Sequence, residues 1–141
     1  MSDVDAGWPG GADGAEEGDE GWDPAFDGGL REAYDLMNGE NFAGLEAHEE
    51  MLADRVRVDA YHRGIHGNVK KGDVVLDLGT GTGLLAFMAS RAGAKKVYAV
   101  EHSDFIDLAR EIADYNGFTN IEFVRANSRE FTPPEPIDVV L

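Results

Sequence analysis

The sequence contains no cysteine, so the chain has no disulfide, thiolate metal ligand or cysteine nucleophile, and it gives no indication of redox compartment. No apolar run approaches the roughly 20 residues that a membrane-spanning helix needs. The acidic N-terminus also lacks the apolar segment of a signal peptide. We therefore expect a soluble, cytoplasmic protein without a membrane partner.

Basic residues are scarce as well. The 141 residues include 12 Lys and Arg against 28 Asp and Glu, which gives a net charge of −16 at pH 7. A chain this acidic repels a phosphate backbone, so we expect no direct binding to nucleic acid. The excess suits a basic protein as substrate, but we favour solubility or adaptation to salt as its explanation.

Residues 1–29 contain no basic side chain, but nine acidic residues and eight glycines. Such a segment buries too little apolar surface to offset its ordering entropy, which predicts a disordered acidic tail. Trp8 and Trp22 lie inside it, either as docking anchors or as parts of a solvated tail. The rest of the chain has room for one small domain.

Residues 73–83 have the pattern of a buried strand that runs into a glycine-rich turn. The strand's apolar residues, typical of a parallel sheet covered on both faces, are Val74, Val75, Leu76 and Leu78. Three glycines at alternate positions let the backbone turn sharply and approach a ligand closely. Strong helix formers follow from Leu84 to Arg91. A doubly wound α/β fold binds nucleotide-like ligands at such a strand-to-helix junction.

The remaining pattern completes an α/β fold with parallel strands 1–4 and flanking helices. Further strands are predicted at 96–100, at 121–124 and from 137, with a Pro-broken loop before the last. Ser103 or Asp104 would cap a helix that ends at residues 116–117. Ahead of the first strand, residues 45–66 predict an amphipathic helix, or two with a kink near Gly64, ending at residues 67–68. Its two apolar rows are Leu45, Leu52, Val56 and Ala60, and Met51, Val58 and Ile65.

The spacing of the glycines distinguishes two kinds of ligand. The dinucleotide fingerprint is G-x-G-x-x-G with an acidic residue about 20 positions further on. Here the pattern is D-x-G-x-G-x-G from Asp77 to Gly83, so Leu84 occupies the position of the third dinucleotide glycine. Glu101 ends the second predicted strand, where a carboxylate can accept hydrogen bonds from both ribose hydroxyls. This combination resembles the class I S-adenosylmethionine-dependent methyltransferases.

Segments on both sides of the glycine turn resemble the protein arginine methyltransferases. They are H-E-E-M-L-x-D-x-V-R over 48–57, G-D-V-V-L-D-x-G-x-G-x-G over 72–83, and A-G-A-K-K-V-Y over 92–98. The resemblance covers roughly residues 45–141 and implies a Rossmann-like class I methyltransferase fold that binds S-adenosyl-L-methionine. It divides the chain after the tail into a helical cofactor-lid segment, 30–68, and an incomplete cofactor-binding domain, 69–141.

The resemblance further implies how the methionine part of the cofactor is held. Arg57 would pair with its carboxylate, because a guanidinium binds a carboxylate through two hydrogen bonds. A surface pair with Asp54, three residues earlier on the same helix, is the simpler alternative. The rest of the methionine would be held by Asp77, Gly79, Thr80, Gly81 and Gly83. Asp77 could instead cap the adjacent helix.

At the other end of the cofactor, the resemblance implies that Glu101 binds the ribose, the alternative being a solvated strand end. Asn127 and Ser128 would contact the adenine edge or form a plain loop. Met51 and His48 would line the site near the sulfonium, or be an ordinary core methionine and a helix-surface histidine. No catalytic residue is identified by the resemblance.

The sequence departs from the arginine methyltransferase pattern at two places. Only Phe42 is aromatic where the family has a tyrosine-rich stretch, and the family's two substrate-clamping glutamates would follow the fourth strand, beyond Leu141. We therefore expect the N-terminal part of a longer methyltransferase, which transfers methyl to a protein side chain of the arginine type and forms a homodimer at full length. His62 and His66 have no acidic partner in register, so we predict no metal site.

The sequence is also compatible with other functions. One is a methyltransferase for ribosomal proteins or for a small molecule, and another is a non-catalytic module that binds S-adenosylmethionine. A nicotinamide dinucleotide domain is disfavoured by Leu84 at the third-glycine position and by Arg57 ahead of the first strand.

Overall fold

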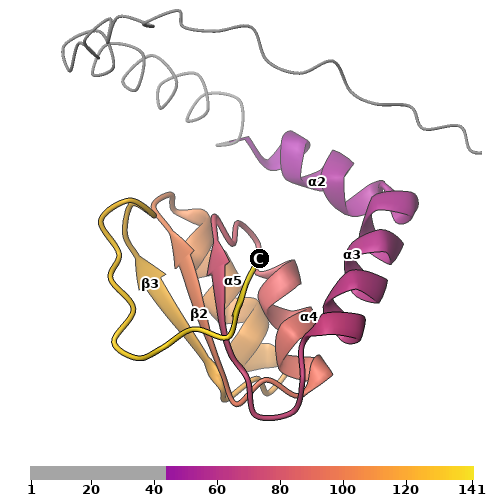
Figure 1. Cartoon of the computed structure of the whole chain (residues 1–141). Helices are drawn as coiled ribbons and strands as arrows, with labels where there is room; N and C mark the ends of the chain where they lie inside the picture. The colour runs from indigo at the N-terminus through magenta and orange to yellow at the C-terminus, as the bar shows by residue number, and fades with distance from the viewer. Residues whose placement is uncertain (1–43) are drawn as a thin grey trace, which may run out of the picture. The chain divides into compact units, whose positions relative to one another are not determined.

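The computed structural model describes residues 44–141, all within one of two compact units of the chain, Leu36–Leu141. The tail expected over 1–29, and residues 30–43, lie outside the described residues. Figure 1 shows the elements, which are α2 (Leu45–Ala53), α3 (Arg55–Asn68), β1 (Val74–Leu78), α4 (Leu84–Ala92), β2 (Lys96–Glu101), α5 (Phe105–Tyr115), β3 (Ile121–Arg125) and β4 (Val139–Val140). No helix in this part of the chain is long and apolar enough to span a membrane.

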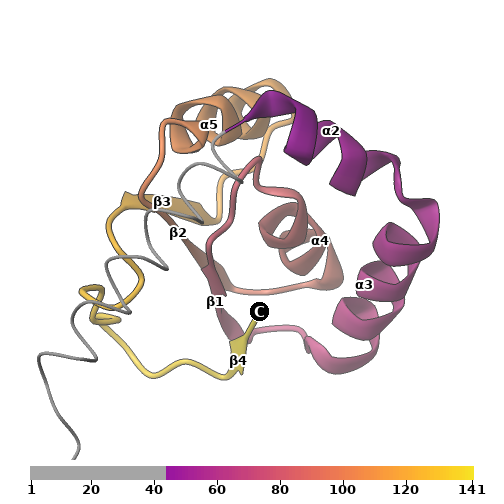
Figure 2. The same ribbon diagram turned by 90° about the horizontal axis from the view of Figure 1, so that it is seen from above.

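The four strands form one parallel sheet in the order β3-β2-β1-β4 (Figure 2). This arrangement confirms the predicted α/β fold class. The short β4 is continued on both sides, because the Asp138 N–H donates to the Val74 carbonyl at 2.9 Å and the Leu141 N–H to the Leu76 carbonyl at 2.8 Å. The strand order reverses beside β1, and ligands of open α/β sheets bind at the carboxyl end of such a switch point.

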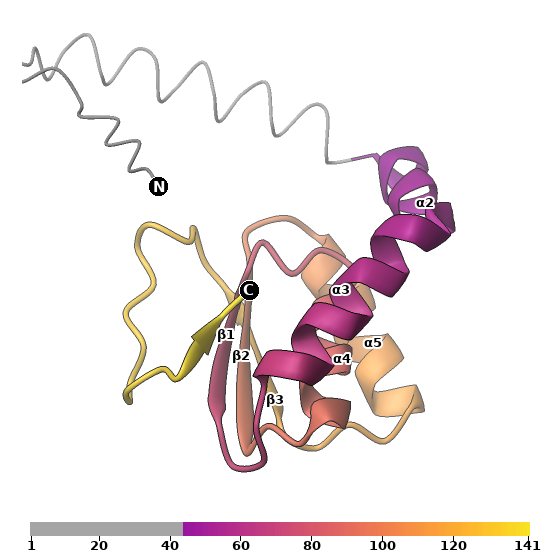
Figure 3. The same ribbon diagram turned by 45° about the vertical axis from the view of Figure 1, so that its right-hand side comes forward.

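The two faces of the sheet are covered in different ways (Figure 3). Helices α3, α4 and α5 lie on one face, where the fully buried strand residues are Val75, Val97 and Ala99. The loop between β3 and β4 covers the other face through Phe131 and Ile137, and buries Val74, Leu76, Tyr98 and Val100. The Tyr98 hydroxyl donates a hydrogen bond to Glu135 Oε1 at 2.7 Å and so ties this loop to β2. The expected burial on both faces holds for β1 as far as Leu76, whereas Leu78 is 39% exposed.

Helix ends follow the predicted capping residues. Helix α4 stops at Gly93, which has φ 110°, and α5 stops at Asn116 before Gly117, which has φ 72°. Glycine adopts this left-handed conformation without a Cβ clash, so it ends a helix readily. At the start of α5, Ser103 Oγ accepts from the Phe105 N–H at 3.4 Å, whereas Asp104 makes no capping bond.

The helical segment ahead of β1 breaks at Asp54, so the predicted kink near Gly64 was wrong. Asp54 Oδ1 accepts a hydrogen bond from the Arg57 N–H at 3.1 Å and caps the first turn of α3. A capping carboxylate satisfies helix donors at a new helix start. Gly64 lies inside α3, because a single glycine costs a helix only about 1 kcal/mol and does not break it alone.

Only one of the two apolar rows on this segment faces the core. Ile65 is 4% exposed and Val58 packs against the same cluster as α4 and β1. In the other row Leu45 is 60% exposed and Val56 80% exposed. The break at Asp54 changes the direction of the helix, so a row that is continuous in the sequence does not form one continuous face.

Candidate functional site

The turn between β1 and α4 curls over the end of β2. The backbone N–H groups of Gly79 and Thr80 both donate to the Val100 carbonyl, at 2.8 and 3.0 Å. Gly79 and Gly81 have φ values of 77° and 54°, in the region that L side chains rarely adopt. A Cβ placed on Gly81 would lie 2.7 Å from His48 Cε1. Glycine is therefore needed at position 81 both for the backbone conformation and for the approach of α2.

Asp77 lies one residue before the end of β1 and is 1% exposed. Its Oδ2 accepts from the Thr80 hydroxyl at 2.6 Å, and the carboxylate also accepts from the Ala86 N–H in α4. Burial raises the pKa of Asp77 to about 6, although both hydrogen bonds act in the opposite direction, and nearby Glu101 raises the pKa further. Asp77 therefore lies beside the first turn of α4, and a cationic ligand would stabilise the ionised form of its carboxyl group.

Glu101 ends β2 and is buried rather than solvated, with 9% of its surface exposed. Its Oε2 accepts from the Gly81 N–H at 3.0 Å and its Oε1 from the Ser103 N–H at 2.9 Å. His102 Nδ1 lies 3.3 Å from the same Oε1. Burial would raise the pKa of Glu101, but the hydrogen bonds from Ser103 and Gly81, together with His102, outweigh it and lower the pKa. The glycine turn and the end of β2 thus share one ionised carboxylate.

A cavity of about 350 Å³ adjoins the glycine turn. The predicted site residues that line it are His48, Met51, Arg57, Asp77, Gly79, Thr80 and Gly81. The His48 ring also packs on Phe105, with 4.0 Å between the ring centroids. This volume is within the range of small-molecule sites. Gly83 and Glu101 are not part of this lining, but Glu101 contacts the lining residue Gly81.

Arg57 lies where the cavity meets a more open groove of about 880 Å³ lined by α3 and β4. Its Nε lies 3.5 Å from Asp54 Oδ2, and the two side chains are 50% and 45% exposed. Such an exposed pair three residues apart contributes at most about 1 kcal/mol. The surface pair is therefore present, and its guanidinium can still turn toward an anion in the cavity at small cost.

Asn127 and Ser128 follow β3, outside the cavity lining. Asn127 Oδ1 accepts from the Arg129 N–H at 3.0 Å, which closes a tight turn. The neighbouring Ala126 N–H donates to the Glu101 carbonyl at 3.2 Å, so this turn lies beside the end of β2. A contact of Asn127 and Ser128 with adenine stays a prediction.

Packing adds residues to the site that the sequence did not single out. Tyr61 lines both the cavity and the groove, one helical turn after Arg57. Its position four residues after Arg57 was a usable signal. Phe105 supports His48 from another element, and nothing local in the sequence indicates that contact. The remaining cavity residues are Leu52, Val58, Leu78, Thr82, Leu84, Leu85 and Leu141.

The two neighbouring histidines of α3 stack on one another. The ring centroids of His62 and His66 are 4.0 Å apart, and His66 Nδ1 lies 3.0 Å from the His62 carbonyl oxygen. Among residues 44–141, no group of three or more His, Cys, Asp or Glu is arranged to hold a metal ion.

The groups around the glycine turn suit a ligand that carries a carboxylate, an ammonium and a sugar diol. Arg57 supplies a cation for the carboxylate, and Asp77 supplies an anion for the ammonium. Glu101 accepts two backbone hydrogen bonds, and a carboxylate has about four acceptor positions, so it retains capacity for hydroxyl donors.

Comparison with known proteins shows that this chain is similar to methyltransferases. Residues 46–141 match the family described as Ribosomal protein L11 methyltransferase (PrmA). The chain is 43% identical over 103 residues to protein arginine N-methyltransferase PRMT10 of Oryza sativa subsp. japonica, a match that covers 71% of this chain and 27% of that protein.

Solved structures of arginine methyltransferases have the same fold. The crystal structure of Arabidopsis thaliana protein arginine methyltransferase 10 superposes with a TM-score of 0.67 and 38% identity, over 70% of this chain and 29% of that one. The Trypanosoma brucei PRMT1 enzyme-prozyme heterotetrameric complex with AdoHcy gives a TM-score of 0.67 and 36% identity, over 71% of this chain and 32% of that one. The chain thus spans about a third or less of the length of these relatives.

Proposed function

Because the chain belongs to the class I S-adenosylmethionine-dependent methyltransferases and is a homologue of the protein arginine methyltransferases, we propose that residues 45–141 bind S-adenosylmethionine as the cofactor half of an enzyme that methylates protein arginine. The observation that carries this proposal is the hydrogen bond from the Gly81 N–H to Glu101 Oε2 at 3.0 Å. It brings the glycine turn and the ribose-type carboxylate together beside a cavity that Arg57 and Asp77 also line.

Each group of the site has a counterpart on the cofactor. Arg57 would hold the methionine carboxylate, and Asp77 the ammonium, with the backbone of residues 79–83 against the methionine chain. Glu101 would accept hydrogen bonds from the ribose hydroxyls, and Asn127 with Ser128 would border the adenine. When bound, the cofactor supplies a methyl group activated on a sulfonium, so the protein's task is to position the acceptor and to exclude water.

Met51 and His48 would form the part of the wall nearest the reacting end. Both line the cavity from α2, and His48 contacts the ring of Phe105. Helix α2 has no buried residue, so its hold on the rest of the site is limited to a few side chains such as His48. The whole protein would complete the acceptor side, and no residue between 44 and 141 is assigned a catalytic role.

The acceptor would be a basic protein. The net charge of −16 steers basic partners toward the chain. The trypanosome relative is an enzyme-prozyme heterotetramer, and we propose likewise that the whole protein is oligomeric, as a homodimer. Methyl transfer by the whole protein to an arginine-rich peptide, but not to the same peptide with lysine at every arginine, is the expected result.

A second candidate is a methyltransferase for ribosomal proteins, which the match of residues 46–141 to the PrmA family favours. Methylation of a ribosomal protein, with none of the arginine-rich peptide, would support this second candidate. Cofactor binding without transfer to either peptide or to ribosomal protein would point to a non-catalytic module.

Thermal unfolding with added ligand tests the cofactor itself. A ligand that binds the folded chain alone raises its melting temperature by mass action. We expect a rise with S-adenosylhomocysteine and none with NAD, and no rise for the Glu101→Ala variant. Glu122→Ala removes an exposed carboxylate on β3 that pairs with Lys96 at 2.6 Å, and it should keep the full response. A rise with NAD alone would overturn the proposal.

A further inference from the structure

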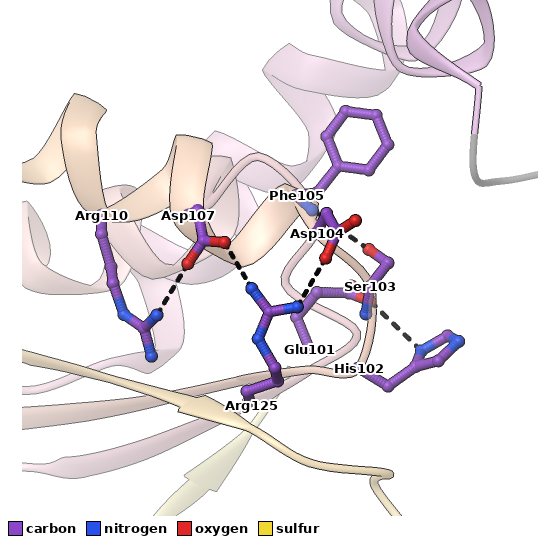
Figure 4. Close-up of polar contacts among 8 residues, drawn as sticks. All are labelled: Glu101, His102, Ser103, Asp104, Phe105, Asp107, Arg110 and Arg125. Carbon is purple, nitrogen blue, oxygen red and sulfur yellow. Dashed lines mark hydrogen bonds and ion pairs between the residues drawn. The ribbon is translucent and has the colours of Figure 1, made fainter.

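Arg125 joins the end of β3 to the first turn of α5 (Figure 4). Its Nη1 donates to Asp104 Oδ1 at 2.7 Å, and its Nη2 donates to Asp107 Oδ2. Arg110 binds the same Asp107 through Oδ1 at 2.9 Å. Arg125 alone among these residues connects β3 to Asp104, the residue that precedes α5.

The backbone places Arg125 directly beside Glu101. In the parallel pairing of β2 with β3, Glu101 and Arg125 are register partners. The next residue on β3, Ala126, donates its N–H to the Glu101 carbonyl at 3.2 Å. Asp104 follows Glu101 by three residues. The ion pair between Arg125 and Asp104 therefore closes a ring, which runs along the turn from Glu101 to Asp104, across to Arg125, and back to Glu101 through the β2–β3 pairing.

This ring encloses the turn that holds the Glu101 carboxylate. The Ser103 N–H donates to Glu101 Oε1 at 2.9 Å, and Ser103 Oγ accepts from the Phe105 N–H at 3.4 Å (Figure 4). The Phe105 ring in turn packs on His48 of α2. A shift of Asp104 would therefore move the donor that orients Glu101, as well as the support of His48.

We propose that Arg125 is a positioning residue for ribose recognition, acting on Glu101 through Asp104 and the β2–α5 turn. The inference rests on the proposed function, in which Glu101 binds the ribose hydroxyls. The side chains of Asp104, Asp107 and Arg125 are 99%, 59% and 40% exposed, so the pairs are screened by salt. Two such pairs are expected to change ligand affinity by about three- to tenfold.

The test compares two ligands on the 1–141 chain by calorimetry. One is S-adenosylhomocysteine, and the other is the same molecule without the ribose 2′-hydroxyl. In Arg125→Gln, affinity for the first ligand should fall by about three- to tenfold, while affinity for the second changes by less than about twofold. Asp104→Asn, at a side chain that is almost wholly exposed, should weaken binding of the first ligand in the same way. Arg125→Lys, which keeps the positive charge, should retain most of the wild-type affinity.

Arg110→Gln is the matched control. Arg110 also links α5 to β3, because its guanidinium donates to the Phe123 carbonyl at 3.0 Å. The Arg110→Gln variant therefore loses one positive charge between these two elements, as Arg125→Gln does, but it keeps the hydrogen bond from Arg125 to Asp104. Its preference for the 2′-hydroxyl should equal that of the wild type. In 0.5 M salt, which screens the ion pairs of Arg125, the affinity of the wild type for S-adenosylhomocysteine should approach that of Arg125→Gln at the same salt.

Three results separate the outcomes. Unchanged affinities in Arg125→Gln would overturn the inference while leaving the proposed function in place. Equal weakening of both ligands would also overturn it, because the residue would then act on general stability rather than on the ribose. Absence of binding by the folded wild-type chain would overturn the proposed function, and the inference with it.

Discussion

The carboxylate of Glu101 accepts a hydrogen bond from the backbone N–H of Gly81, 20 residues earlier in the chain, with 3.0 Å between Oε2 and N. The same carboxylate accepts from the Ser103 N–H through its other oxygen at 2.9 Å. The bond fixes the end of β2 against the glycine turn after β1. One side chain therefore both orders the turn and supplies the group proposed to bind the ribose.

Replacing Glu101 with Gln should destabilise the chain. Gln has one acceptor oxygen, so one of the two backbone donors loses its acceptor, at a cost of about 1 to 3 kcal/mol in the free energy of unfolding. Glu122→Gln, at an exposed side chain, should cost no more than about 1 kcal/mol. Urea unfolding at pH 7 measures both, and equal stabilities for Glu101→Gln and the wild type would contradict the structural role.

The stability of the wild type should also depend on pH through Glu101. The folded pKa lies below its ordinary value, so this stabilisation is present above that ordinary value and is lost as the pH falls through the folded pKa. Between pH 6 and pH 3, urea unfolding curves should show a smaller loss of stability for Glu101→Gln than for the wild type. A larger loss in the variant would reverse the sign of the effect.

Asp77 should act with the opposite sign. The pKa of Asp77 in the folded chain, about 6, lies above the ordinary value of 3.8. Its contribution to the free energy of unfolding is therefore fully present below pH 3.8 and is lost as the pH rises through 6. A difference of about two in pKa corresponds to about 3 kcal/mol. Asp77→Asn should therefore gain stability relative to the wild type between pH 4 and pH 7. Asp59→Asn, on the exposed face of α3, should show no such trend in the same urea titrations.

Gly81→Ala should disturb both the turn and α2. The new Cβ would meet His48 Cε1 at 2.7 Å, and φ at this position is 54°. We expect a loss of about 1 to 3 kcal/mol in stability. Adding His48→Ala should recover only the steric part, since the backbone strain remains. Gly64→Ala, where a Cβ meets nothing within 4 Å, should instead stabilise α3 by about 0.5 to 1 kcal/mol.

Arg57→Ala should separate ligand affinity from stability. Its exposed pair with Asp54 contributes at most about 1 kcal/mol, so the melting temperature should change little. Loss of a charged hydrogen bond to the ligand carboxylate should weaken S-adenosylhomocysteine binding roughly 10- to 100-fold. Arg63→Ala, on the same helix and not part of the cavity lining, should bind as the wild type does. Comparable weakening in both variants would remove Arg57 from the site.

The parts of the fold that sequence predicts are those that local chemistry decides. The glycine turn needs left-handed backbone at Gly79 and Gly81, and no other residue type tolerates it as easily. Gly93 and Gly117 end helices for the same reason. The strands follow from short apolar runs, and their parallel order follows from the helices between them.

Packing between distant elements lies beyond such local signals. Asp54 begins a new helix by accepting from the Arg57 N–H, yet in the sequence it is one polar residue among several. The contact of His48 with Phe105 joins α2 to α5, whose relative placement no periodicity encodes. Asn127 Oδ1 accepts a hydrogen bond from the Arg129 N–H within its own turn, and the adenine contact that the resemblance implies stays a prediction.

The proposal that residues 45–141 hold the cofactor is tested most directly by calorimetric titration of the 1–141 chain with S-adenosylhomocysteine. We expect saturable binding at one site, which is lost in Glu101→Ala and retained in Glu122→Ala. A chain that unfolds cooperatively, and is therefore folded, but gives no binding would contradict it.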